Sequence, residues 1–302
     1  MSQQVGVGIV RLPLAGDETD KERLKLAAGC VKDRLYVMLE GDWGKLTRPE
    51  AQARIIFVYD HLIGVNPKLD ARVLLPGPKA WLAPHLTDIE AFISSSSESP
   101  ALESWNASRT ALSLPVVARM ECEGLPCAGG MGALGWGDGD CEGVPAGAHD
   151  NVVLGGTFDR IHPGHKLLLA MSALAANKRL LIGVSEAALL DKKTLKHIMH
   201  PQPLRAARLL HHLHSVRPSV AFQIVPIQLH SVRPSVAFQI VPIQDPFGPS
   251  IVDRNLQCIV VSRETESGGN SVNRRRVERG LNELVVDVVD LIGPADGDET
   301  NK

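Results

Sequence analysis

The chain has 302 residues, of which 44% are hydrophobic and 22% charged, and its formal net charge is -2 at pH 7. That balance gives no electrostatic reason to expect binding to nucleic acid, and no apolar run approaches the ~20 residues that would cross a bilayer. Five cysteines at irregular spacing, with no secretory signal after Met1, are typical of a reducing compartment, so we expect a cytoplasmic protein.

The first 120 residues alternate between helical and strand patterns. Residues 20–31 show helical spacing, and an apolar run at 35–39 follows as a buried strand. Thr47-Arg48-Pro49-Glu50 carries a capping-box pattern that begins a second helix, and residues 72–75 resemble another strand. This order predicts a small α/β module, and no catalytic constellation indicates its role.

Glycine is dense in residues 121–150, which we interpret as a linker, and the serine run at 94–97 indicates a loop. Residues 130–135 match the dinucleotide fingerprint G-x-G-x-x-G, but neither a strand before the match nor a helix after it is predicted. We therefore treat it as a chance match. Cys122, Cys127 and Cys141 could bind zinc, but three thiols at irregular spacing are weak evidence, and we expect no metal site on the protein.

A strand, a glycine turn and a helix are predicted in succession from residue 151. The apolar run 151–154 precedes Gly155-Gly156-Thr157-Phe158-Asp159, and an alanine-rich helical stretch follows His162-Pro163-Gly164-His165. The two glycines are expected to adopt dihedrals closed to other residues. Pro163 suits the first turn of a helix, which makes His162 the expected N-cap. Both imidazoles would then lie at the positive end of a helix, where an anion binds readily.

A second buried strand is predicted at 179–184, and strand, helix and strand within about thirty residues indicate a parallel sheet. Ser185 would then face the same crevice as His162, because ligands bind outside the carboxyl ends of parallel strands. The next helix is expected at 201–213, with Leu204, Ala207, Leu210 and Leu213 in the core.

The chain then repeats itself without a change: residues 213–228 and 229–244 both read LHSVRPSVAFQIVPIQ. Each copy holds one predicted strand, at 220–225 or 236–241. A sheet built for one such strand must eject the other or place it at an edge. The duplication therefore puts the folding of this part of the chain in question.

The last predicted strands are 256–262 and 284–291, with a polar tail at 293–302. Between them, a glycine-bearing turn at 263–270 precedes a helix at 271–279, which predicts a second phosphate-binding turn in the same crevice. Asn273 and Arg276 lie three residues apart on one helix face, and Arg276 could clamp a polyphosphate with its planar fork.

The first motif resembles the signature of the nucleotidylyltransferase superfamily, which is Gly-Gly-Thr-Phe-Asp followed by His-x-Gly-His. Residues 261–276 read Val-Ser-x-Glu-Thr-x-x-Gly-Gly-x-x-x-Asn-x-x-Arg, which resembles the eukaryotic and archaeal type of phosphopantetheine adenylyltransferase. In animals that domain is part of a bifunctional coenzyme A synthase. The resemblance covers residues 151–292. It implies a Rossmann-like parallel sheet with helices on both faces, the nucleotidylyltransferase fold, beside the smaller α/β module at 1–120.

The resemblance also implies roles for individual residues. His162 and His165 would bind the ATP phosphates and stabilise the transition state, and Lys193 would neutralise phosphate. The second substrate would contact Thr157, Lys193 and Arg205. The nucleotide would be held by residues of both motifs, namely Gly155, Gly156, Thr157, Phe158, Asp159, Gly164, Ser262, Glu264, Thr265, Gly268, Gly269, Asn273 and Arg276.

The implied reaction transfers the adenylyl group of ATP, with Mg2+ on its triphosphate, to 4'-phosphopantetheine. Residues 1–302 contain no G-x-x-x-x-G-K-[ST] loop, so the kinase activity of the animal enzyme is expected to be absent, with a separate dephospho-coenzyme A kinase as partner. Association with mitochondria is known for the animal relatives. Two alternatives stay open: a cytidylyl- or nicotinamide-mononucleotide-type nucleotidylyltransferase, and a catalytically impaired scaffold or binding protein. The oligomeric state is left open.

Overall fold

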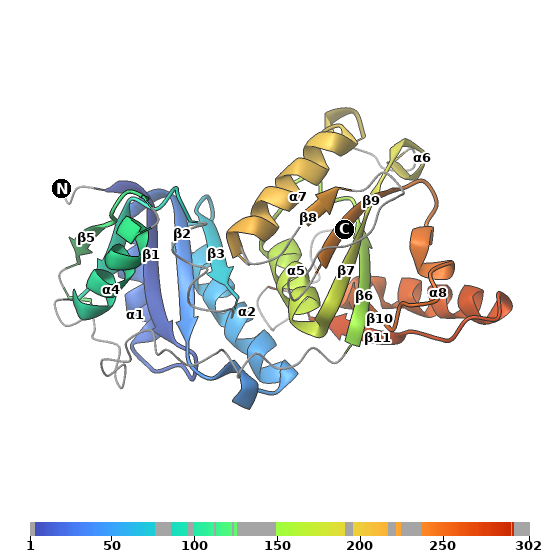
Figure 1. Ribbon diagram of the computed structural model, residues 1–302, viewed down its shortest axis with the longest axis horizontal. Coiled ribbons are helices and arrows are strands. Elements are labelled where there is room, and N and C mark those ends of the chain that lie inside the picture. The colour runs from blue at the N-terminus through green and yellow to red at the C-terminus, as the bar shows by residue number, and fades with distance from the viewer. Residues whose placement is uncertain are drawn as a thin grey trace, which may run out of the picture. The chain divides into compact units, whose positions relative to one another are not determined.

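A computed structural model describes ten stretches of the chain: 4–75, 86–95, 99–111, 113–122, 124–125, 149–190, 196–216, 222–224, 237–290 and 292. They form two compact units, one within Met1–Val144 and one within Pro145–Leu291 (Figure 1). The division falls inside the predicted linker, of which residues 126–148 lie outside the described part, as does the tail from residue 293. The roles assigned to these segments stay predictions.

The N-terminal unit is a five-stranded parallel sheet with helices beside it. Its strand order is β3-β2-β1-β4-β5. The strands are β1 (Val5–Pro13), β2 (Val31–Glu40), β3 (Asp70–Leu74), β4 (Ala91–Ser94) and β5 (Ala118–Glu121), and the helices are α1 (Asp20–Gly29), α2 (Arg48–Val65) and α4 (Ser99–Ala111), with a short 3-10 turn, η1 (Trp43–Lys45). The predicted capping box is present, because Glu50 accepts hydrogen bonds from the backbone N–H and the hydroxyl of Thr47 at 2.7 Å.

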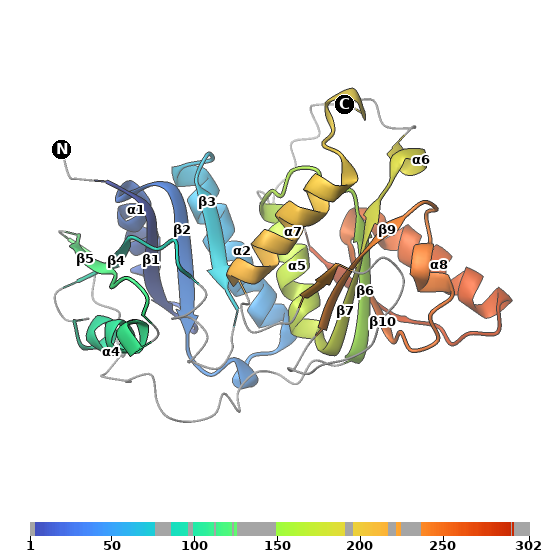
Figure 2. The same ribbon diagram turned by 45° about the horizontal axis from the view of Figure 1, so that its top comes forward.

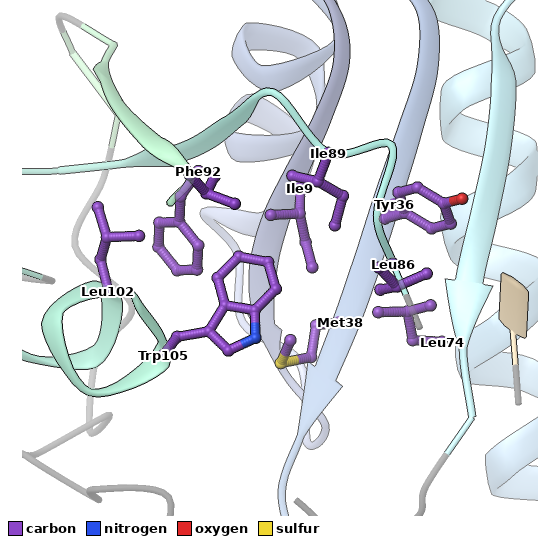
Figure 3. Packing of buried hydrophobic residues seen from close by; sticks show 10 residues of the cluster. Ile9, Tyr36, Met38, Leu74, Leu86, Ile89, Phe92, Leu102 and Trp105 are labelled. Carbon is purple, nitrogen blue, oxygen red and sulfur yellow. The ribbon is translucent and has the colours of Figure 1, made fainter. Parts of the chain in front are cut away.

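One apolar cluster joins this sheet to α4 (Figure 3). Trp105 of α4 packs against Phe92 of β4, with ring centroids 6.1 Å apart, and side chains of three more strands complete the cluster: Ile9, Tyr36, Met38 and Leu74. Sequence patterns missed β1, β4, β5 and α4. The expected loop at 94–97 begins inside β4, because Ser94 is a fully buried strand residue rather than a loop residue.

The C-terminal unit is a six-stranded parallel sheet in the order β11-β10-β6-β7-β9-β8. Helices α5 and α7 lie on one side of this sheet and α8 on the other (Figures 1 and 2). This is the Rossmann-like α/β arrangement that was predicted. The elements are β6 (His149–Gly156), α5 (Pro163–Ala175), β7 (Ala176–Ser185), α6 (Ala187–Leu190), η4 (Lys196–Ile198), α7 (Gln202–Val216), β8 (Phe222–Ile224), β9 (Ala237–Ile243), η5 (Gly248–Ile251), β10 (Cys258–Ser262), η6 (Arg263–Thr265), α8 (Glu266–Glu278) and β11 (Val285–Val289).

The expected core face of α7 is confirmed at Leu213 and wrong at Leu204 and Ala207. Leu204 is 41% exposed and Ala207 is also exposed, whereas the buried face carries Arg205, Ala206, Leu209, His212, Leu213 and Val216. The hydrophobic pattern alone is misleading here, because a buried arginine and a buried histidine occupy positions that a purely apolar stripe would exclude. The helix is thus rotated so that the guanidinium of Arg205 points into the unit.

Both copies of the repeat contribute to the described fold, but each contributes a different part. The first four residues of the first copy, 213–216, form the end of α7, where Leu213 and Val216 are buried. The strand segment of the second copy is β9, which pairs with β7 along seven residues. The sheet therefore uses the beginning of one copy and the end of the other, and the sixteen added residues lie between them.

The additional strand lies at the sheet edge, as predicted. β8 comes from the first copy and pairs in parallel with β9, matching Phe222 to Phe238 and Ile224 to Ile240, so identical residues face each other. Two contacts join the carboxyl end of β9 to β7 and to the residue that follows it. Glu186 donates its N–H to the carbonyl of Ile243 at 2.8 Å, and a Cβ on Gly183 would lie 3.0 Å from the Ile243 side chain.

Phe238→Ala should lower the free energy of unfolding by ~3 kcal/mol or more, because Phe238 is 1% exposed in an inner strand. The matched change Phe222→Ala, at the equivalent position of the other copy, should cost much less. Urea unfolding of both variants and of the double variant measures this. Two mild single changes with a severe double change would contradict the assignment and show that the copies exchange places.

Candidate functional site

The turn from β6 to α5 brings the two histidines of the first motif together. β6 ends at Gly156, and His162 is the N-cap of α5 with extended dihedrals, φ -107 and ψ 170, followed by Pro163 in the first turn. The rings of His162 and His165 have centroids 3.9 Å apart. Two imidazoles thus lie side by side at a helix N-terminus, as predicted, where the helix dipole favours an anion.

The dihedral reason expected for the glycines is wrong, and the absence of a Cβ atom is what matters. Neither Gly155 nor Gly156 has a left-handed φ; within this turn that conformation belongs to Phe158, with φ 49. A Cβ on Gly156 would lie 2.8 Å from the Phe158 ring, so glycine is required there for space. A Cβ on Gly164 would lie 3.2 Å from the His162 ring, so that glycine lets the imidazole fold over the helix start.

Phe158 packs against His165 of this pair. Its side chain is fully buried, and its ring centroid lies 5.2 Å from that of His165. This burial argues against a contact between the Phe158 side chain and a nucleotide, and the expected nucleotide-binding role of the residue stays a prediction. A bulky residue held at positive φ is strained. Surrounding contacts must hold this turn in place.

Arg205 of α7 supplies those contacts. Its guanidinium donates to the carbonyls of Thr157, Ser185 and His200, the last at 2.9 Å and the Ser185 bond at 2.6 Å. The side chain is 1% exposed, so the predicted contact with substrate is wrong. Burial lowers the pKa of Arg205, against the opposing charges of Asp159 and Glu186. Arg205 instead joins the glycine turn, the end of β7 and the segment before α7.

A second link to the same turn runs through His200, which sequence patterns did not single out. Asp159 accepts a hydrogen bond from the His200 backbone N–H at 2.7 Å, and the His200 Nδ1 atom lies 3.1 Å from the same carboxylate oxygen. Burial alone would raise the pKa of Asp159, but the hydrogen bonds from His200 outweigh it and lower the pKa. Arg208 lies 3.2 Å from His200 Nε2. Both contacts are satisfied when the His200 ring carries its hydrogen on Nδ1, which then donates to Asp159, while Nε2 accepts from Arg208.

The two histidines differ in environment. Burial lowers the pKa of His162, and the nearby charge of Lys166 lowers it further, so the neutral imidazole is favoured at neutral pH. His165 Nδ1 lies 3.1 Å from the carbonyl oxygen of Arg160. Since a carbonyl only accepts, Nδ1 of His165 carries the hydrogen in that contact. The hydrogen bond to Arg160 therefore sets the orientation of the His165 ring before any ligand binds.

The second motif begins at the same edge of the sheet. β10 lies beside β6, with Cys258 opposite Val152, and both strands end in polar turns. Ser262, the last residue of β10, forms a capping box with Thr265, their hydroxyl oxygens 2.9 Å apart. Glu264 and Thr265 are exposed. On the other side of β6, the Ser185 hydroxyl donates to the carbonyl of Gly156 at 3.3 Å. Three strand ends thus meet, as predicted.

Several residues of the second motif serve the fold rather than a ligand. The helix starts at Glu266, earlier than expected, so Gly268 and Gly269 lie in its first turn and not in a loop. Gly269 is buried, and a Cβ there would lie 3.0 Å from Val286, which shows that it permits close packing of α8 on the sheet. Gly268 is exposed, with open space around its missing Cβ.

The expected polyphosphate clamp at Arg276 is also wrong. Its guanidinium is fully buried and donates to the carbonyls of Asn282 at 2.6 Å and Asp253 at 3.0 Å, and to that of Ser250. Asn273 uses both ends of its amide on the backbone of Leu284, at 2.8 Å each. These two residues attach α8 to the segments that enter the neighbouring strands, so neither is placed to hold a nucleotide.

The remaining predicted site residues have simple positions. Gly155 is exposed, and the Thr157 side chain is half-buried. Lys193 lies outside the described residues, as do Cys127 and Cys141. Across the described part of the chain, no group of three His, Cys, Asp or Glu side chains could hold a metal ion. No helix there is long and apolar enough to cross a membrane.

Known proteins resemble the C-terminal unit. The family described as Cytidylyltransferase-like matches residues 153–294. A phosphopantetheine adenylyltransferase of Saccharomyces cerevisiae is 36% identical over 147 residues, which cover 49% of this chain and 43% of that protein. The phosphopantetheine adenylyltransferase of Pyrobaculum aerophilum is 32% identical over 142 residues, which cover 47% of this chain and 80% of that protein.

The chain belongs to the phosphopantetheine adenylyltransferase family. It spans 40% of the length of a similar Schizosaccharomyces pombe protein and 43% of the Saccharomyces cerevisiae relative. A solved structure of a protein with unknown function from Archaeoglobus fulgidus has 23% identity and a TM-score of 0.39, covering 49% of this chain and 96% of that one. Residues 1–144, with their own sheet, lie before the matched region.

Arg205→Ala should lower the free energy of unfolding by ~3 kcal/mol or more, because three backbone carbonyls lose their hydrogen-bond donor. Leu204→Ala, on the exposed side of the same helix, is the matched control and should cost well under ~1 kcal/mol. Urea unfolding measures both. Equal losses in the two variants would show that Arg205 does not fasten the turn.

The imidazole of His162 should titrate below its ordinary pKa of ~6.5. Because the folded-state pKa is lowered, the contribution of this group to stability is complete above about pH 6.5 and is lost as the pH falls from there through the folded-state pKa. Histidine NMR titration measures the midpoint. Lys166→Met should raise it, and Lys178→Met, which removes a distant partner of Asp150, should not. A midpoint at or above pH 6.5 would refute the assignment.

Proposed function

We propose that this chain transfers the adenylyl group of ATP to 4'-phosphopantetheine, giving dephospho-coenzyme A and pyrophosphate. The observation that carries the proposal is the contact of His162 with His165 at the N-terminus of α5, beside the glycine end of β6. Family membership supports the substrates, because relatives that match the same half of the chain are named phosphopantetheine adenylyltransferase.

In this mechanism the 4'-phosphate oxygen of phosphopantetheine attacks the α-phosphorus of ATP, and the bond to the leaving pyrophosphate breaks. No covalent bond to the protein is needed, so the protein acts by positioning and by stabilising charge. The first N–H groups of α5 lack intrahelical acceptors and favour a phosphate at that place. A preorganised donor aimed at developing charge contributes about 3 kcal/mol in comparable sites.

The two imidazoles would act differently. His162, neutral before binding, would donate one hydrogen bond. The Nδ1–H of His165 donates to the carbonyl of Arg160, so its Nε2 would donate to a phosphate only in the imidazolium form. The negative charge of a bound triphosphate favours that form. Lys193 would add a cation, and Thr157 would lie near the attacking phosphate, as the family resemblance implies.

Ser262, Glu264 and Thr265 remain the candidates for holding the nucleotide from the second motif. They lie on the turn after β10, at the same sheet edge as Gly155 and Gly156. Arg205, Arg276 and Asn273 would act only through the backbone they fasten. Gly269 would contribute by letting α8 pack close to the sheet, and the exposed Gly268 remains a candidate for contact with the nucleotide.

We place Mg2+ on the triphosphate of ATP rather than on a protein site. Asp159, the carboxylate of the first motif, already accepts from His200 and lies near Arg160, so it is ill suited to hold the metal alone. When bound with ATP, the metal would neutralise charge on the phosphates. We also propose a dephospho-coenzyme A kinase as a functional partner, because the product carries the ribose that such an enzyme phosphorylates.

The motif at 261–276 carries the resemblance to the adenylyltransferase domain of eukaryotic coenzyme A synthase. We infer that the chain shares the adenylyltransferase activity of that enzyme. A cytoplasmic location, with mitochondrial association as the alternative, is proposed from the sequence alone. A cytidylyl-type activity is the second candidate, since the matching family is described as Cytidylyltransferase-like. A screen of ATP against CTP, and of phosphopantetheine against nicotinamide mononucleotide, distinguishes these activities.

Pyrophosphate release by the purified chain should require both ATP and 4'-phosphopantetheine. His162→Ala and His165→Ala should each reduce the rate at least ~100-fold, since each removes a donor to developing charge. His211→Ala, on the exposed side of α7, is the matched control and should leave the rate unchanged. A folded protein that releases no pyrophosphate with any acceptor, with or without the repeat, would refute the enzymatic proposal and favour a binding or scaffold role.

Deleting one copy of the repeat distinguishes a loss of activity caused by the duplication from a wrong assignment of the function. Because the two copies are identical, removing 213–228 or 229–244 gives the same polypeptide. If only the shortened chain is active, the duplication is the lesion and the assignment holds. If neither chain is active, the assignment fails.

A further inference from the structure

Two cysteines far apart in the chain have their sulfur atoms in contact within the N-terminal unit. The Sγ atoms of Cys30 and Cys122 lie 3.4 Å apart, although 92 residues separate them. Cys30 is the C-cap of α1 and is buried, while Cys122 directly follows β5 and is half-buried. A disulfide has a sulfur–sulfur distance of about 2.05 Å, so the two atoms need to approach by roughly 1.4 Å.

The surrounding backbone indicates which side can move. Cys30 is held on both sides, because its N–H donates to Ala27 at 3.1 Å and its carbonyl accepts from Val5 at 3.0 Å. Cys122 follows a four-residue strand at the edge of the sheet, whose residues are mostly exposed and which pairs with β4. Short edge strands are the weakest part of a sheet. The approach can therefore come from Cys122.

We propose that Cys30 and Cys122 form a reversible intramolecular disulfide when the chain meets hydrogen peroxide. The Cys122 sulfur attacks the peroxide oxygen, the O–O bond breaks, and one water leaves, which gives a sulfenic acid on Cys122. The Cys30 sulfur then attacks the Cys122 sulfur, the S–O bond breaks, and a second water leaves. Two thiols are oxidised, one peroxide is reduced, and a dithiol reductant reverses the reaction.

The order of the two steps follows from the environments of the thiols. Burial raises the pKa of Cys30 to about 12, and the neighbouring Cys122 sulfur raises it too. Since the thiolate is the nucleophile, Cys30 is a poor first attacker, and Cys122 is the more accessible of the two. Cys30 acts second, on a sulfur already beside it. Reversible pairs of this kind are compatible with a reducing compartment.

The bond would link the end of α1 and the start of β1 to the edge strand β5. That predicts two physical effects in the oxidised chain. Backbone amides of β5 should exchange with solvent more slowly, because the strand end is tethered. The unfolding temperature of the N-terminal unit should rise by several degrees, because the closed loop restricts the unfolded chain.

The test uses the full chain, reduced and then exposed to a small excess of hydrogen peroxide. Intact mass should fall by two hydrogen atoms, peptide mapping should join Cys30 to Cys122, and dithiothreitol should restore the mass. Cys30→Ser and Cys122→Ser should each abolish the joined peptide. Cys258→Ser is the matched control, since that buried cysteine belongs to the other unit, and it should leave the joined peptide intact.

Three results would overturn the proposal: no loss of mass, a Cys122 that stops at sulfenic or sulfinic acid, or a disulfide from Cys122 to Cys127 or Cys141. Circular dichroism of each serine variant guards against loss of folding. Should Cys30→Ser unfold, Cys30→Ala replaces it. Amide exchange of β5 that is equal in both redox states would refute the tether even if the bond forms.

Discussion

The guanidinium of Arg205 is the contact on which the candidate site most depends. It reaches the carbonyls of Thr157, Ser185 and His200, which come from the glycine turn, the end of β7 and the segment before α7. The turn contains Phe158 at positive φ, a strained conformation that short turns do not keep without help. A buried charge with several hydrogen bonds is costly to misplace, so it defines one geometry for all three segments. His162 and His165 follow the glycine turn directly, so their positions depend on the same contacts.

The same kind of contact is made by two other buried arginines in the described part of the chain. Arg276 donates to backbone carbonyls around α8, and Arg109 donates to those of Pro115 and Leu86 around α4. Each arginine is fully buried and fastens irregular backbone that has no ladder of its own. Loops of parallel sheets leave many carbonyls without partners, and the five N–H groups of one guanidinium satisfy several of them at once. Motif arginines can therefore be structural even beside a binding site.

The duplication is absorbed without breaking the sheet because its two copies serve different elements. Helix α7 ends in the first copy and β9 lies in the second, beside β7 in the sheet. The added strand β8 continues the sheet by pairing with its own duplicate in register. Parallel pairing places each residue of β8 beside the identical residue of β9, and the pattern that suits one strand suits the other. The identical extra strand is therefore accommodated at the edge of the sheet.

The sequence by itself determined the parallel α/β class of the C-terminal unit, the β6–α5 turn, and the neighbourhood of His162 and His165. These follow from local causes: an apolar run, glycines, a proline at the helix start and fixed spacing along one helix. Only the tertiary structure decided which polar residues of the motifs bind backbone groups of the protein itself. Arg205, Arg276 and Asn273 look alike in sequence whether they bind phosphate or backbone, because a guanidinium or an amide serves both, and burial is set by segments distant along the chain. The same holds for Cys30 and Cys122, whose contact across 92 residues no spacing rule could reveal. The role of Phe158 under His165 and the edge position of β8 likewise depend on how distant elements pack.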